Sequence, residues 1–306
     1  MSFLSLLAAL LLEQTRPLRD DNPIYLAFDR YATLLERQFN AGEEHHGTIA
    51  WLLAVAPIAL ATAAIQYALY AISPILGWLW NMAILYLTMG FRQFSHYFTQ
   101  ITQALRAGDT VKARDYLGRW RGESAEELTA SEVARVTIEL ALVGSHRHVF
   151  GPIAWFLVAG PVGPVIYRTC ALMSEKWGRR RDPDFGQFGM FAQKAFYRID
   201  WLPARLTAAS FAIVGNFEDA IYCWRTQAGT WARGAHGLII ATGGGALGVR
   251  LGDALHQGGT LKYRPELGLG DEAHLDYLQS GVGLIWRALV LWMFLILVVT
   301  VAHSLG

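Results

Sequence analysis

Apolar residues gather into five blocks along this chain, and polar segments separate them. The blocks cover residues 3–12, 48–72, 74–89, 149–173 and 284–305. The last block carries a single charge, Arg287, over a length of about 20 residues, which is the length of helix that crosses the hydrocarbon core of a bilayer. A water-soluble helix keeps a polar stripe, and this block has none. The pattern therefore predicts a membrane helix at the end of the sequence.

The first three blocks predict further membrane segments. Residues 48–72 are long enough to span, and Ser73-Pro74 ends them, because proline lacks an amide donor and disfavours helix at the residue before it. Residues 74–89 then form a second span in a tight hairpin. Residues 3–12 have the length of a signal-peptide core, but neither a basic start nor a small-residue cleavage site flanks them. They are predicted to be a short, retained membrane segment.

The block at 149–173 is interrupted by Gly151-Pro152 and again by Gly and Pro residues at 160–164. It is either one kinked span or a re-entrant pair of half-helices, whose irregular backbone must be satisfied by protein or water. Residues 90–148 carry eight Lys and Arg, and residues 174–201 carry six. Basic loops prefer the cytoplasm, and one full span would place these two on opposite sides. The charges favour the re-entrant alternative.

The segments between the blocks show helical spacing of apolar residues, most clearly at 91–106 and 131–144. They predict a cytoplasmic portion of amphipathic helices over residues 91–148, whereas residues 224–283 are rich in glycine and resemble a loop. The predicted fold class is all-α. We expect one domain, residues 1–306, a polytopic protein of the bacterial inner membrane with four or five membrane segments.

Composition limits the partners. The chain is 53% hydrophobic and 17% charged, which suits a few spans joined to sizeable polar segments. A formal net charge of +1 gives no electrostatic basis for binding nucleic acid, and no nucleic-acid partner is expected. The lipid bilayer is the expected partner. The 11 Trp, 12 Tyr and 15 Phe also offer contact surfaces for a membrane-protein partner or a second copy of the chain.

Two short motifs invite a cofactor interpretation that the sequence does not support. Residues 243–248 match G-x-G-x-x-G, but no helical pattern follows within a βαβ unit, so a close-packed turn is favoured over a dinucleotide site.

Histidines are dense at 45–46 and at 146–148. Neither group has the H-E-x-x-H spacing, and adjacent histidines are expected to point in different directions. They are predicted to be surface residues, and no metal site is expected.

Three segments, taken together in their order and spacing, carry a family resemblance. They are the A-L-x-x-G-D-x-x-x-A-R-x-x-L pattern at 104–117, P-A-R-L at 203–206 and G-A-L-G-V-R-L-G at 245–252. This arrangement resembles the CobD/CbiB family, the membrane-bound adenosylcobinamide-phosphate synthases of cobalamin assembly. The resemblance implies joining of an amino alcohol to a corrinoid carboxylate, with ATP and therefore Mg²⁺.

The chain departs from that family at an acidic motif. The family has E-S-x-A-E-N-x-x-D-G where this chain has residues 139–148, and only Glu139 remains. Residues 199–206 instead resemble AmpE, a sister group linked to β-lactamase regulation. The resulting expectation is a catalytically degenerate, AmpE-type accessory or sensory membrane protein that is not an enzyme and needs no cofactor. An anion-binding groove would remain, and its predicted residues are Arg114, Arg205, Arg250, Gly248 and Gly252.

Alternatives stay open at this point. Each of the three arginines has a structural alternative, as a partner to a helix end or to a loop carboxylate. The chain could also be an active synthase that holds ATP and Mg²⁺ with a rearranged set of acids: Glu139, Asp109 and Asp200. A third alternative is a structural subunit packed into a larger membrane complex.

Overall fold

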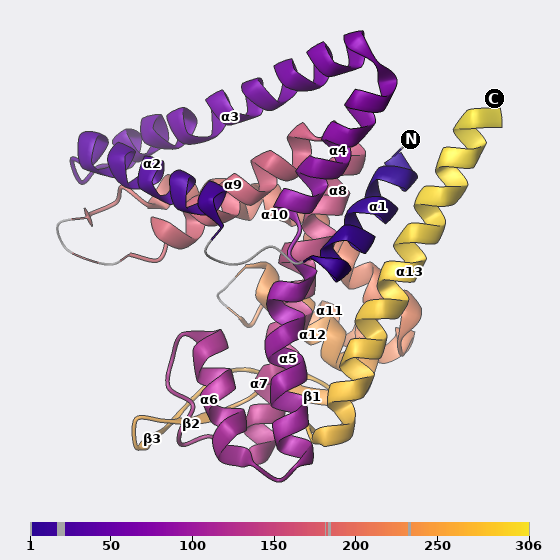
Figure 1. The fold of residues 1–306 in the computed structure, drawn as a ribbon. Helices are drawn as coiled ribbons and strands as arrows, with labels where there is room; N and C mark the ends of the chain where they lie inside the picture. The colour runs from indigo at the N-terminus through magenta and orange to yellow at the C-terminus, as the bar shows by residue number, and fades with distance from the viewer. Residues whose placement is uncertain (1, 17–21, 181, 183–184, 232–233, 306) are drawn as a thin grey trace. The chain divides into compact units, whose positions relative to one another are not determined.

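The computed structural model describes residues 2–16, 22–180, 182, 185–231 and 234–305. The chain is mostly helical and forms two compact units (Figure 1). Unit 1 comprises Met1–Gly90 and Gly151–Pro203, and unit 2 comprises Phe91–Phe150 and Ala204–Gly306. Helix α10 (Met190–Val214) contributes residues to both units.

The described residues of unit 1 form helices and the turns and bends that connect them. Besides the first part of α10, its helices are α1 (Ser2–Thr15), α2 (Pro23–Phe39), α3 (Glu44–Ile72), α4 (Pro74–Thr88), α8 (Gly151–Ala159) and α9 (Val162–Lys176). The predicted break at Ser73-Pro74 is confirmed: the Ser73 hydroxyl accepts a hydrogen bond from the Ile75 amide, and Pro74 occupies the first helical position of α4. The turn that joins α3 to α4 is visible in Figure 1.

The interrupted block at 149–173 is not one continuous α-helix. A π-helical turn (His146–Phe150) leads into α8, and Gly160-Pro161 separates α8 from α9. The two helices pack so closely that a Cβ atom at Gly163 would lie 2.0 Å from the Trp155 carbonyl oxygen. With 9 and 15 residues, neither matches the usual length of a span.

Unit 2 combines helices with short strands. Its helices, besides the end of α10, are α5 (Phe91–Arg106), α6 (Thr110–Arg121), α7 (Ala130–Ser145), α11 (Phe217–Gln227), α12 (Ala235–Leu247) and α13 (Leu275–Leu305). Helices α5 and α7 confirm the helical segments predicted at 91–106 and 131–144. A core cluster joins them around Ile101, Leu117 and Val133, which are fully buried.

The prediction of a loop over residues 224–283 is wrong. This stretch contains α12, the start of α13 and five strands, so the all-α prediction also fails here. The strands are β1 (Val249–Gly252), β2 (Leu255–Gln257), β3 (Thr260–Lys262), β4 (Glu266–Gly268) and β5 (Asp271–Glu272). Strand β1 pairs antiparallel with β4, with Leu251 opposite Leu267, and parallel with β5, while β2 and β3 form a hairpin.

Two helices of the described residues are long and apolar enough to cross a membrane. They are Glu44–Ile72 and Leu275–Ala302, whereas α1, α4 and α12 are apolar but shorter. Only 22% of the apolar window of α3 is buried, and its Leu60 and Ile72 side chains are 70% and 73% exposed. A helix in the core of a soluble protein would hide such residues. These helices support a membrane location.

Candidate functional site

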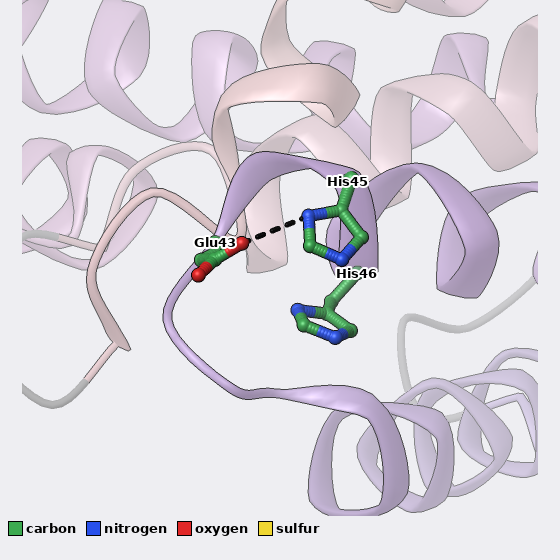
Figure 2. Close-up of side chains that lie close together, drawn as sticks. All are labelled: Glu43, His45 and His46. Atoms are coloured by element: carbon green, nitrogen blue, oxygen red, sulfur yellow. Dashed lines mark ion pairs between the residues drawn. The ribbon is translucent and has the colours of Figure 1, made fainter.

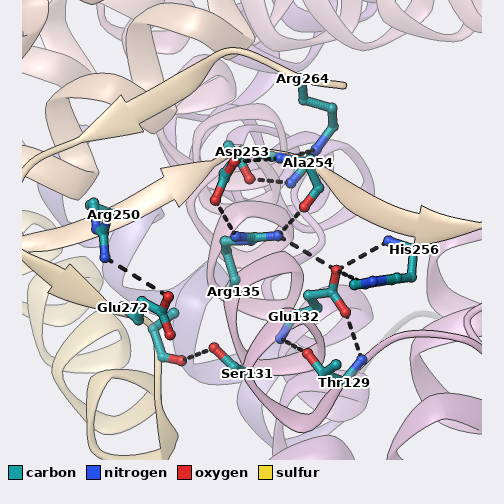
Figure 3. Close-up of polar contacts among 12 residues, drawn as sticks. Thr129, Ser131, Glu132, Arg135, Arg250, Asp253, Ala254, His256, Arg264 and Glu272 are labelled. Carbon is teal, nitrogen blue, oxygen red and sulfur yellow. Dashed lines mark hydrogen bonds and ion pairs between the residues drawn. The ribbon is translucent and has the colours of Figure 1, made fainter. Parts of the chain in front are cut away.

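Helix α7 presents three charged side chains at helical spacing, and each contacts the segment that follows β1. Glu132, Arg135 and Glu139 lie at i, i+3 and i+7, which places them on one face. Figure 3 shows Glu132 and Arg135 projecting from α7 toward the strand segment that carries Asp253, Ala254 and His256. The helix begins with a capping box, in which the Thr129 hydroxyl accepts from the Glu132 amide and the Glu132 carboxylate accepts from the Thr129 amide.

Glu139 is held by an arginine and a backbone amide. Its two carboxylate oxygens accept hydrogen bonds from the Arg264 guanidinium at 2.8 and 3.0 Å, and Oε1 also accepts from the Gly252 amide at 2.8 Å. Arg264 in turn donates to the carbonyl oxygens of Gly252 and Asp253. The Glu139 side chain is only 6% exposed. This buried pair fixes the turn after β1.

Glu132 holds the next segment. Its Oε1 atom accepts from the His256 backbone amide at 3.1 Å and lies 2.9 Å from the His256 Nδ1 atom. Burial opposes ionisation of this carboxyl, but the hydrogen bonds from Thr129 and His256 outweigh it and lower the pKa of Glu132 to about 2. Glu132 therefore remains a carboxylate at physiological pH.

Asp253 is the last member of this network, and its backbone conformation is strained. It is the only non-glycine residue with a positive φ, +60°, in the described part of the chain. Its carboxylate accepts from Arg135 at 3.2 Å and from the Ala254 amide at 2.7 Å, while Arg135 also donates to the Ala254 carbonyl. Strain of this kind often marks functional segments, because the surrounding contacts must compensate for it.

The arginines predicted to form an anion-binding groove have different surroundings. The Nε atom of Arg114 donates to the Leu128 carbonyl at 2.6 Å, which is the structural alternative. Arg250, on β1, is 43% exposed and lies 3.9 Å from Glu272, and its Nε atom is buried without a hydrogen-bond partner among the described residues. Arg205 lies half-buried on α10. Their shared role in binding an anion stays a prediction.

The two glycines predicted at that groove shape the backbone. Gly248 ends α12 with φ +66°, and Gly252 has φ +70°. A Cβ atom at Gly252 would lie 2.1 Å from the Pro265 carbonyl oxygen, so no side chain fits there. Gly252 therefore keeps β1 close to Pro265, whereas at Gly248 only the left-handed backbone favours glycine, because nothing lies within 4 Å of a Cβ atom there.

The three acids of the rearranged metal site each have a structural contact. Asp109 caps α6: it accepts from the Lys112 amide at 3.0 Å, and that bond and the Lys112 ammonium lower its pKa. Asp200, buried in unit 1, accepts from the Tyr167 hydroxyl at 2.7 Å. Glu139 contacts Arg264 and Gly252 as described above. None of these contacts joins two of the three acids.

Sequence reasoning missed most of this network. Arg135, Asp253, His256 and Arg264 were not predicted as site residues, although Glu132, Arg135 and Glu139 share one helical face. That periodicity was available from the sequence. The residues that bind this face of α7 lie 113 to 125 positions further along the chain, and no local sequence pattern predicts contacts over such a separation.

Comparison with known proteins gives the family. The family model described as CobD/Cbib protein matches residues 6–302. The chain belongs to the CobD/CbiB family. It is 35% identical over 301 residues to the cobalamin biosynthesis protein CobD of Stutzerimonas stutzeri, covering 96% of this chain and 97% of that one. It is also 35% identical to the CobD of Chromobacterium violaceum, over 79% and 78% of the two chains. No solved structure matches.

This membership corrects the main functional expectation. The AmpE-type, catalytically degenerate interpretation is wrong, because the CobD/CbiB model matches residues 6–302 and the relatives that match 96% and 79% of this chain are named as cobalamin biosynthesis proteins. The error came from one assumption: that a single acidic motif at 139–148 decides whether the scaffold is active. Similarity spread over the whole chain carries more weight than one segment.

Proposed function

We propose that this CobD/CbiB protein is an active adenosylcobinamide-phosphate synthase of cobalamin biosynthesis. It would form an amide bond between an amino alcohol and a corrinoid carboxylate at the expense of ATP. The observation that carries the proposal is the 35% identity to a CobD protein over 96% of the chain. The sequence patterns at 104–117, 203–206 and 245–252 support it.

Arg250 is the residue that we assign to an anionic group of a substrate. Its guanidinium is 43% exposed, whereas those of Arg135 and Arg264 are 12% and 16% exposed and contact Asp253 and Glu139. The Nε atoms of Arg250 and Arg135 both lack a hydrogen-bond partner among the described residues, so exposure is what distinguishes Arg250. The planar fork of arginine suits a phosphate or a carboxylate. The network around Glu139 positions β1 and so positions Arg250. Arg114 and Arg205 are second candidates for the same groove.

The residues of the network do not fit a magnesium ion as they stand. Magnesium is held by carboxylate oxygens and water in octahedral geometry. The oxygens of Glu139 accept from Arg264 and Gly252, and those of Glu132 accept from Thr129 and His256. Two guanidinium groups also lie against these acids, and they repel a dication. The network is therefore unsuited to holding Mg²⁺, and ATP would have to bring its metal to other residues.

The proposed location is the bacterial inner membrane, with the chain crossing it several times. Helices α3 and α13 have the length and apolarity of spans, and the exposed apolar side chains of α3 support contact with lipid. We propose four or five membrane segments, with α8 and α9 as a re-entrant pair.

A complementation experiment tests the proposed function. The gene is expressed in a host that lacks its own synthase and must make cobalamin from a corrinoid acid, and the product is followed by mass spectrometry. We expect rescue by the wild-type chain and at least about tenfold less product from Arg250→Ala at equal membrane expression, because a bidentate contact to an anion is lost. Arg119→Ala, which alters an exposed i,i+4 ion pair with Asp115, serves as the control and should rescue fully.

The proposal fails under a defined outcome. If the wild-type chain is present in the membrane but gives no rescue, while another family member does so in the same host, the chain is not a synthase. If Arg250→Ala rescues as well as Arg119→Ala, the synthase assignment stands and the role of Arg250 is wrong.

A further inference from the structure

Three potential metal ligands meet at the start of α3, in unit 1. Figure 2 shows Glu43, His45 and His46 with their side chains close together. The Nδ1 atom of His45 lies 3.0 Å from a carboxylate oxygen of Glu43, and the two imidazole rings have centroids 3.9 Å apart. One ligand atom from each residue can be chosen so that all three lie within 4.8 Å of one another.

The backbone explains why adjacent histidines converge here, against the sequence-based expectation. Glu43 precedes the helix and is extended, with φ −106° and ψ 151°. His45 and His46 lie in the first turn, where no preceding turn restricts their side-chain rotation. Their rings can therefore tilt toward each other and toward Glu43, although the Cα–Cβ bonds of adjacent helical residues diverge.

The donor set selects a class of metal ion. Two imidazole nitrogens and one carboxylate oxygen suit divalent late first-row metals such as Zn²⁺ or Ni²⁺, whereas Mg²⁺ prefers oxygen alone. The His46 Nδ1 atom is buried and has no hydrogen-bond partner among the described residues. Ligand atoms around a tetrahedral zinc lie about 3.4 Å apart, given bonds of about 2.1 Å. The 3.0 Å between His45 and Glu43 and the 4.8 Å limit for the whole group bracket that spacing.

Among the charged groups at the start of α3, Glu43 is the one that attracts a cation to this site. Glu44 is engaged by Lys194, whose Nζ atom lies 2.7 and 2.8 Å from its two oxygens, so Glu44 is not counted as a ligand. The first turn of a helix carries partial positive charge, which opposes a cation and which the Glu43 carboxylate offsets. His45 and Glu43 are 62% and 68% exposed, so an ion can enter and water can complete its coordination.

We propose that Glu43, His45 and His46 bind one divalent late transition-metal ion at the start of α3. The site is separate from the charged network of unit 2 and independent of the proposed synthase activity.

The test measures metal bound to the purified full-length protein in detergent. The protein carries an affinity tag without histidine, is stripped with a chelator and is titrated with Zn²⁺, Ni²⁺ or Mg²⁺. We expect about one equivalent of Zn²⁺ or Ni²⁺ and no saturable Mg²⁺ at this site. The double variant H45A/H46A should bind at least about tenfold more weakly, and E43Q should lose affinity to a smaller extent.

His274→Ala is the matched control, because His274 is also exposed and lies 3.6 Å from a carboxylate oxygen, that of Asp276, but has no second histidine beside it. It should bind metal like the wild type. Equal binding by wild type and H45A/H46A would overturn the site, as would a wild type that binds no Zn²⁺ or Ni²⁺. If the double variant does not fold, H45Q and H46Q are measured singly, and unchanged binding in both again overturns it.

Discussion

At the scale of single residues, Glu139 shows why a carboxylate cannot be assigned from sequence alone. It is the one acid that remains of the family's motif at 139–148, and it was therefore the first candidate for a metal ligand. The structure gives it a bidentate partner, Arg264, located 125 positions away and outside every motif that was considered catalytic. The residue type was visible in the sequence, but the partner that decides its role was not.

The Glu139–Arg264 pair makes a stability prediction. Arg264→Ala leaves a buried carboxylate without its cation, and this should lower the free energy of unfolding by roughly 3 kcal/mol. Glu139→Ala should cost a similar amount, and the double variant should cost less than the sum, because the two changes remove one interaction. Denaturant unfolding in detergent, followed by circular dichroism, measures this. Arg119→Ala is the control, with a change below about 0.5 kcal/mol. Additive losses would show that the pair is not coupled.

Glu132 predicts a pH dependence of stability. Its pKa is lowered from 4.5 to about 2 in the folded protein, so folding favours the carboxylate form. This contribution is present above about pH 4.5 and is lost as the pH falls toward about 2, up to roughly 3 kcal/mol. Unfolding midpoints measured across that window should fall less steeply in Glu132→Gln than in the wild type. Parallel curves for the two proteins would contradict the prediction.

At the scale of elements, α12 explains why the glycine-rich stretch was mistaken for a loop. Glycine lowers helix propensity, and Gly243, Gly244 and Gly245 stand in a row. In the structure these glycines are buried. Cβ atoms there would lie 2.7 Å from the Leu142 side chain, 2.8 Å from the Gly268 Cα atom and 2.5 Å from the Asp219 carbonyl oxygen. Close packing against α7, β4 and α11 overrides local propensity, and only tertiary structure reveals it.

Packing and propensity give opposite predictions for Gly245→Ala. Propensity alone would stabilise the helix by up to about 1 kcal/mol. The new Cβ atom would instead clash with backbone of α11, and we expect destabilisation of roughly 1–3 kcal/mol. Gly283→Ala in α13 is the matched control, since nothing lies within 4 Å of a Cβ atom there, and its stability should be unchanged or higher. Thermal unfolding of the two variants checks this, and a more stable Gly245→Ala would refute the packing argument.

At the scale of the whole molecule, the apolar pattern predicted the helical blocks well, because block length and proline breaks are local signals. The residue order within three motifs was enough to indicate the family, which the comparison confirms. The functional conclusion failed because it inferred inactivity from one altered segment. The strands after α12 were missed for a different reason: each has two to four residues, too few for an alternating pattern.

The re-entrant arrangement of α8 and α9 yields a prediction of membrane sidedness. If the pair enters and leaves on one side, Glu126→Cys in the segment before it and Arg179→Cys after it should both react with a membrane-impermeant thiol reagent only in inverted vesicles, because both lie in basic segments that are predicted to be cytoplasmic. Ile72→Cys, at the 73% exposed end of α3, should react from the opposite side and serves as the control. The native thiols give little background, because Cys170 and Cys223 are buried, and burial raises the pKa of Cys223 to about 11.

Labelling of Arg179→Cys from outside intact cells would mean that residues 149–173 cross the membrane once.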